Sequence, residues 1–176
     1  FAYINYPVAN VVSLIDTRGI NFSKTTNMSS MFNSGKAIYY KINIDGMDTS
    51  NVEDMSFMLY NTATSNGDYS EILNAPGFST KNVKNMSNMF RGAQATSLNL
   101  SGLDFSNVED MSHMLQSGNL TSLNLTGLHI PKVKDMSYFV SGTKLSDYNV
   151  LSALDTSNVE RSEEHTSELQ SLREIS

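Results

Sequence analysis

The hydrophobic and polar positions of the chain form short alternating triplets that recur at long intervals. Each triplet places one polar residue between two apolar ones, at residues 42–44, 98–100, 123–125 and 148–150. This period-two pattern is typical of a half-buried β-strand. The central residue is asparagine in every triplet, and it points outward if its neighbours point into a core. We therefore predict four short strands that expose one column of amides, formed by Asn43, Asn99, Asn124 and Asn149.

A second pattern follows the triplets and has the spacing of an α-helix. Val108, Met111, Met114 and Leu115 fall at i, i+3, i+6 and i+7, which is one helical face. Upstream, Ser106 and Glu109 have the spacing of a capping box, in which the hydroxyl and the carboxylate each accept from a first-turn amide. This pattern predicts a short helix after each strand.

Both patterns belong to one repeated unit. The residues around Met111 return four more times, and the first methionine of each copy serves as its anchor; the anchors are Met28, Met55, Met86, Met111 and Met136. Their separations are 27, 31, 25 and 25 residues, and a sixth copy begins at residues 154–160. A unit of this length cannot bury its apolar face alone, so such units pack on their own copies.

The predicted fold is an α/β solenoid, a leucine-rich-repeat-like stack of about five to six strand–turn–short-helix coils with one parallel sheet. It occupies residues 12–160 and follows a partial N-terminal segment at residues 1–11. Residues 161–171 resemble the translation of a common sequencing adapter, so residues 161–176 are interpreted as a non-native tail. The longest interval between anchors indicates an insertion near residues 61–69, which is either a binding loop or a neutral one.

Packing of successive units makes equivalent positions neighbours. The position after the repeated valine alternates in charge from one unit to the next, through Glu53, Lys84, Glu109, Lys134 and Glu160. We expect these five side chains to form one column on one face. Alternation replaces repulsion between like charges with a ladder of weak ion pairs.

Composition and charge exclude several classes of function. The chain has 176 residues, the length of about one domain, and 39% hydrophobic against 17% charged residues, which favours a packed core over disorder. Its net charge of −6 argues against nucleic acid as a partner. Cysteine is absent, so disulfides and thiolate zinc sites are excluded, and no apolar run is long enough to span a membrane.

The residues that carry chemistry have structural interpretations that we favour. Methionine pairs bind Cu(I), but their spacing here is that of a core face. Repeated acidic positions, Asp54, Asp110 and Asp135, suit a calcium site or an acid–base pair, but the favoured interpretation is the first turn of a helix, where the dipole favours negative charge. The three histidines, His113, His129 and His165, are isolated in sequence. We therefore predict no catalytic residue, no metal site and no cofactor; the amide column is the leading binding surface, with a purely structural amide ladder as its alternative.

The motif resembles a known family. Residues 102–115 and 47–56 resemble the repeat of BspA-type bacterial surface proteins, in which F-D-T-S-N-V-T-D-M-S-x-M-F recurs. His129-Ile130-Pro131-Lys132 departs from this pattern, as does Thr25 in the place of the valine. The resemblance implies an extracellular location on the bacterial surface and adhesion to a host protein or glycan.

Two other functions fit the same units. One is a passive stalk that spaces another domain from the cell envelope. A polysaccharide-acting solenoid enzyme is less favoured, because the outward strand residues are mostly asparagine, which does not transfer protons. The sequence leaves the oligomeric state open.

Overall fold

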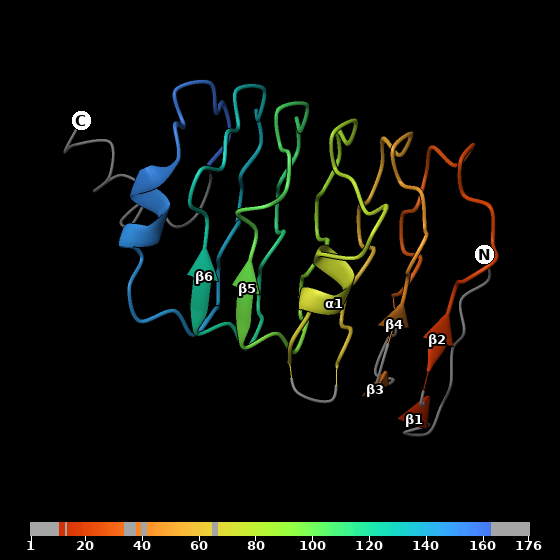
Figure 1. The fold of residues 1–176 in the computed structure, drawn as a ribbon. Coiled ribbons are helices and arrows are strands. Elements are labelled where there is room, and N and C mark those ends of the chain that lie inside the picture. Colours follow the sequence, from red (N-terminus) through yellow and green to blue (C-terminus); the bar gives the residue numbers. More distant parts are fainter. Residues whose placement is uncertain (1–10, 13, 34–37, 40–41, 65–66, 163–176) are drawn as a thin grey trace.

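The computed structural model describes residues 11–12, 14–33, 38–39, 42–64 and 67–162, and the repeated units lie side by side in sequence order (Figure 1). The regular elements are short. They are β1 (Val11–Val12), β2 (Ile15–Asp16), β3 (Ile38–Tyr39), β4 (Ile42–Asn43), α1 (Ser70–Leu73), β5 (Ser97–Asn99), β6 (Ser122–Asn124) and the 3-10 helix η1 (Asn149–Ala153).

The strands pair in parallel with the equivalent strand of the neighbouring unit. β1 pairs with β3, β2 with β4 and β5 with β6, each as a separate two-stranded sheet. The register places Leu98 opposite Leu123 and Asn99 opposite Asn124. Leucine is buried and asparagine exposed in both strands, so the alternation predicted for β5 and β6 is confirmed.

The predicted fold class is wrong. The described residues contain no single parallel sheet and no row of strand–turn–short-helix coils, so this is a β-rich domain with short strands and not an α/β solenoid of five to six coils. One α-helix of four residues, α1, is present in the described part, and it lies in the stretch where the third unit would have a strand. Residues 148–150, predicted as a strand, instead lead into η1.

Two aspartates account for these missing strands. Oδ1 of Asp68 accepts from the amide of Ser70 at 2.8 Å, and Oδ1 of Asp147 accepts from the amide of Asn149 at 2.8 Å. A side-chain acceptor two residues upstream favours a turn over extended backbone. Each chain segment therefore enters a short helix where its neighbours run as strands.

The predicted helices around the anchors are also absent, because one residue in each run has left-handed backbone. This residue lies two positions after the anchor, and its φ is between 56° and 60° in all five copies: Ser30, Phe57, Asn88, His113 and Tyr138. An α-helix needs φ near −63° at every position. The residues at these sites are not glycine, so the sequence carried no sign of the break.

Successive turns replace the helix and join the units through their backbones. Within one run, the amides of Met114 and Gln116 donate to the carbonyls three residues earlier, at 3.2 and 3.1 Å. Three other amides of the run donate to the following unit: Met111 to the carbonyl of Asp135, His113 to that of Ser137 and Leu115 to that of Phe139, at 2.7–2.9 Å. Every second amide of the run thus holds the next unit.

A ladder of single parallel bridges marks the same junction in every unit. It runs through the residue before each anchor: Asn27, Asp54, Asn85, Asp110, Asp135 and then Arg161. Arg161 is the first residue of the predicted tail and takes the place of the next aspartate in this ladder. Residues 1–10 and 163–176 of the two predicted terminal segments lie outside the described residues.

The core is continuous along the units, as the repeat predicted. All five anchors are buried, with exposed fractions of 0–3%, and they pack with the inward strand residues in one hydrophobic cluster. In the third unit, Tyr69, Ile72 and Leu73 supply the core from around α1. The strands and the turn runs therefore form two layers on opposite sides of one core.

Candidate binding surfaces

Two of the four predicted amides lie together on the strand side. Asn99 and Asn124 are exposed and directly opposite each other in β5 and β6. Oδ1 of Asn99 accepts from the amide of Ser101 at 3.2 Å, and Oδ1 of Asn124 accepts from the amide of Thr126 at 3.0 Å. Among the described residues, neither Nδ2 has a hydrogen-bond partner, so two amide donors face solvent about 4.8 Å apart.

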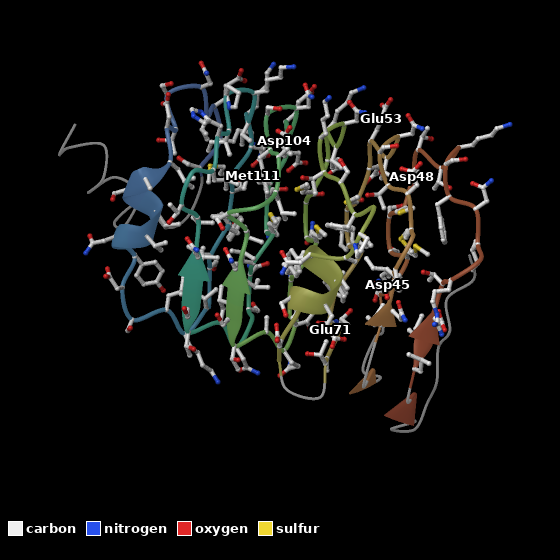
Figure 2. The ribbon with its side chains drawn as sticks, viewed as in Figure 1. Asp45, Asp48, Glu53, Glu71, Asp104 and Met111 are labelled. Carbon is white, nitrogen blue, oxygen red and sulfur yellow. The ribbon has the colours of Figure 1, made fainter. Side chains whose placement is uncertain are left out.

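The other two predicted amides do not join this pair. Asn43 is half-buried in β4, and α1 lies between β4 and β5 (Figure 1). It borders a shallow groove with Asp45, Glu71 and Asn74, and Figure 2 places the two carboxylates on this strand side. Asn149 belongs to η1, which is not a strand. The predicted column of four is therefore interrupted in the third unit and ends before the sixth.

The repeated acidic positions stabilise turns. Oδ1 of Asp54, Asp110 and Asp135 accepts from the amide two residues later at 2.8, 2.8 and 2.9 Å. Their predicted place in the first turn of a helix is wrong, because no helix follows them. Asp54 also accepts from Nδ2 of Asn27, and Asp135 lies 3.6 Å from the guanidinium of Arg161. No group of three metal-binding side chains occurs within the described ranges.

The alternating charge column is confirmed. Backbone hydrogen bonds of 2.7–2.9 Å link its members in order, from Glu53 through Lys84, Glu109 and Lys134 to Glu160. Nζ of Lys84 lies 2.7 Å from Glu53, and Nζ of Lys134 lies 3.9 Å from Glu160. The hydrogen bond to Glu53 raises the pKa of Lys84. The side chains of both pairs are more than half exposed, so the column adds little stability and mainly favours the correct alignment of neighbouring units.

The predicted capping boxes are replaced by another contact. Oγ of Ser106 donates to Asp104 at 2.6 Å, and its amide donates to the same carboxylate oxygen at 2.9 Å. These bonds lower the pKa of Asp104. The same arrangement lowers the pKa of Asp48 through Ser50 and that of Asp155 through Ser157. The serines thus close the loop at the end of each strand segment, where Figure 2 labels Asp104.

A further surface, which the sequence did not single out, lies on the turn side. Two files of side chains alternate there. The second-position file contains the left-handed residues Ser30, Phe57, Asn88, His113 and Tyr138, and the fifth-position file contains Asn33, Tyr60, Arg91, Gln116 and Ser141. We call these ten residues the turn face. Their variation within an otherwise repeated motif was the available signal.

Side chains of the two files touch within three of the five units. The rings of Phe57 and Tyr60 lie 5.6 Å apart, and Nη1 of Arg91 donates to Oδ1 of Asn88 at 3.2 Å.

His113 is therefore not isolated. Its Nδ1 lies 2.9 Å from Oε1 of Gln116, and its ring stacks on Tyr138 of the next unit at 4.7 Å. His129 is exposed and His165 lies outside the described residues.

The fold and its surfaces define a repeat protein whose consecutive units are joined through their backbones. The family described as Mycoplasma protein of unknown function, DUF285, matches residues 8–128, and the chain belongs to this family. No curated protein and no solved structure matches the chain. Among the described residues, no helix is long and apolar enough to cross a membrane.

Proposed function

We propose that the chain is a non-catalytic repeat domain of a bacterial cell-surface protein that adheres to a host protein or glycan. The resemblance of its motif to BspA-type surface repeats supports this location and role, and the relation to that group is part of the proposal. Membership of a family described from Mycoplasma is compatible with a bacterial source.

The observation that carries the proposal is the pair of outward amides on the strand side. Asn99 and Asn124 use Oδ1 to close their own turns, which fixes the side-chain orientation and leaves Nδ2 toward solvent. Two oriented donors at the spacing of neighbouring strands match a ligand with paired acceptors, such as a peptide backbone or the hydroxyls of a sugar. Fixed orientation also lowers the entropy lost on binding.

The test removes the donors and keeps the turns. In Asn99→Asp/Asn124→Asp, each new carboxylate retains the acceptor for the turn amide, as Asp16 does at the equivalent place in β2, where it accepts from the amide of Arg18. The control is Asn21→Asp, whose Oδ1 closes a turn with the amide of Ser23 away from the strand face. Each protein is titrated on immobilised mucin, extracellular-matrix proteins and cultured host cells.

We expect saturable binding by the wild-type chain, unchanged binding by Asn21→Asp, and binding at least about tenfold weaker for the double variant, since hydrogen-bonded anchors of an interface cost more than 1 kcal/mol when removed. The melting temperature of Asn21→Asp should match that of the wild type. The double variant should melt somewhat lower, because its two carboxylates lie directly opposite each other in β5 and β6, so binding is compared well below its transition and at a salt concentration that screens the repulsion. Absence of saturable binding by the wild type to every surface would overturn the proposal.

That last outcome would favour the passive stalk. The structural support for a stalk is the ladder of backbone hydrogen bonds that joins every unit from Asn27 to Arg161. Such a ladder needs no ligand for its cohesion.

A further inference from the structure

The turn face differs in composition from the rest of this acidic chain. Its two files contain aromatic, amide and hydroxyl side chains, one arginine, and neither a carboxylate nor an aliphatic residue. The whole chain has a net charge of −6. Because the two files carry no carboxylate, they suit a neutral or acidic ligand, which the acidic remainder of the chain would not attract.

The geometry of the face is set by the backbone. Phe57, Asn88 and His113 each donate an amide hydrogen to the following unit, at 3.0, 2.9 and 2.7 Å, so the files advance by one unit at each step. The aromatic pair Phe57–Tyr60 and the stacked pair His113–Tyr138 therefore flank a polar centre made by Asn88 and Arg91. Two unit spacings, about 10 Å, separate Phe57 from His113.

Backbone strain indicates that the aromatic side chains have a use. Left-handed backbone costs about 1–2 kcal/mol for an ordinary residue, and asparagine or glycine tolerates it best. Phe57 and Tyr138 adopt φ of 56° and 58° all the same. Strain that is retained where a simple substitution would relieve it clusters at functional sites.

A second left-handed position in the same run provides the comparison. It lies six residues after the anchor and holds Asn61, Gly92, Ser117 and Gly142, with φ from 53° to 68°. There the chain uses small or strain-tolerant residues. Gly92 has a separate reason, since a Cβ would meet Oδ1 of Asn61, but a Cβ on Gly142 would make only ordinary contacts. The same backbone conformation thus carries large rings only on the turn face.

We infer that the turn face is a glycan-binding site, on the opposite side of the core from Asn99 and Asn124. Aromatic rings pack against the C–H faces of pyranose sugars, while Arg91 and Gln116 offer donors and acceptors for hydroxyl groups; the buried Asn88 holds Arg91 in place. The rings on either side of the polar centre are about 10 Å apart, a span that fits an oligosaccharide better than a single sugar. A protein partner would instead seek a pocket for an apolar anchor, and the face has no aliphatic residue to line one.

This site goes beyond the proposed function, because it names a ligand class and a second surface that does not involve the strand amides. The test uses the full chain with Phe57→Asn and Tyr138→Asn. Both variants remove a ring and place a strain-tolerant residue, as Asn88 does naturally. The control is Ser117→Asn, which makes the same kind of substitution at a left-handed position outside the two files and copies Asn61. The probes are an array of neutral and acidic oligosaccharides and mucin glycopeptides.

The expected result is retention of at least one oligosaccharide by the wild type, unchanged by Ser117→Asn. Binding falls about tenfold or more in Phe57→Asn and in Tyr138→Asn, which is the loss typical of an interface anchor. The melting temperature of Phe57→Asn stays equal or rises, because strain is relieved.

Three outcomes overturn the inference: no oligosaccharide retained by the wild type, undiminished binding by both ring variants, or a lowered melting temperature of Phe57→Asn, which would make the ring a packing group. If host surfaces bind the wild type and lose affinity only in Asn99→Asp/Asn124→Asp, the proposed function holds while this site is refuted.

Discussion

Replacing Asn88 with alanine or with glycine distinguishes left-handed turns from the helix that the motif suggests. Asn88 has φ of 60° and is 7% exposed, and its side chain accepts one bond from Arg91. Both substitutions lose that bond, so its energy cancels when the two variants are compared. What remains is the backbone preference of the two residues at this position.

The two structures predict opposite signs. In a helix, alanine is favoured over glycine by about 1 kcal/mol. In the left-handed turn, alanine carries a steric cost of about 1–2 kcal/mol, which glycine avoids. The greater freedom of glycine in the unfolded chain offsets about 0.4–1 kcal/mol of this difference. The glycine variant should therefore be the more stable one, by about 0.5–1 kcal/mol.

The measurement is urea unfolding followed by circular dichroism, with the free energy of unfolding extrapolated to water. The difference corresponds to about 1–4 °C in melting temperature for a chain of this size. Ser87 provides the control, because it precedes Asn88, is almost as buried and has negative φ. There the order should reverse, with alanine above glycine. Alanine above glycine at both positions would refute the left-handed run.

Two further predictions concern charge. Lys84→Glu makes a succession of three carboxylates from Glu53 to Glu109, so it should lower the melting temperature more than Lys144→Glu does. The difference should shrink in about 1 M salt, which screens the repulsion. Equal effects at low salt would contradict the column. The pKa of Asp104 is lowered by Ser106, so its contribution to stability is complete above the unfolded pKa near 4 and is lost as the pH falls through the lowered value. Asp104→Asn keeps the turn acceptor and should flatten the melting temperature against pH below about pH 4; a profile parallel to the wild type would count against this role.

Much of the packing was predictable, because burial follows the repeat directly. The anchors, the alternation around Asn99 and Asn124 and the charge column depend only on equivalent residues becoming neighbours. The absence of helices around the anchors was not predictable in this way. A run of turns with left-handed residues at His113 and Ser117 buries Val108, Met111 and Met114 just as a helix would, and these non-glycine residues give no sign of positive φ in the sequence.

The prediction of a strand at residues 148–150 was wrong for a local reason. Its triplet has the same apolar–polar–apolar pattern as residues 123–125, the first two of which lie in β6. The difference is Asp147, whose carboxylate binds the amide of Asn149 and starts η1. Asp68 has the same effect before α1. A pattern of hydrophobicity does not include such a competing acceptor, so the amide column appeared longer than it is.

The turn face was not predictable from the residues that the repeats share. In this fold most of the shared residues have structural roles: they fill the core, close turns or carry the alternating charges. The positions that differ between units, such as Phe57, Arg91 and Tyr138, are those that the structure places on the surface. Candidate binding residues in a repeat of this kind are therefore to be sought in its variable positions as well as among shared residues such as Asn99 and Asn124.

The way the units are joined explains how this variation is tolerated. The amide of Met55 reaches the carbonyl of Asn85 across a 31-residue unit at 2.9 Å, and the amide of Met86 reaches Asp110 across a 25-residue unit at the same distance. The junction thus depends on backbone groups, which every residue except proline supplies in full, and the six extra residues are absorbed around α1. The outward side chains of the turn run are not needed for these backbone bonds, although His113 stacks on Tyr138 of the next unit. Their identity can therefore change unit by unit without loosening the backbone junction.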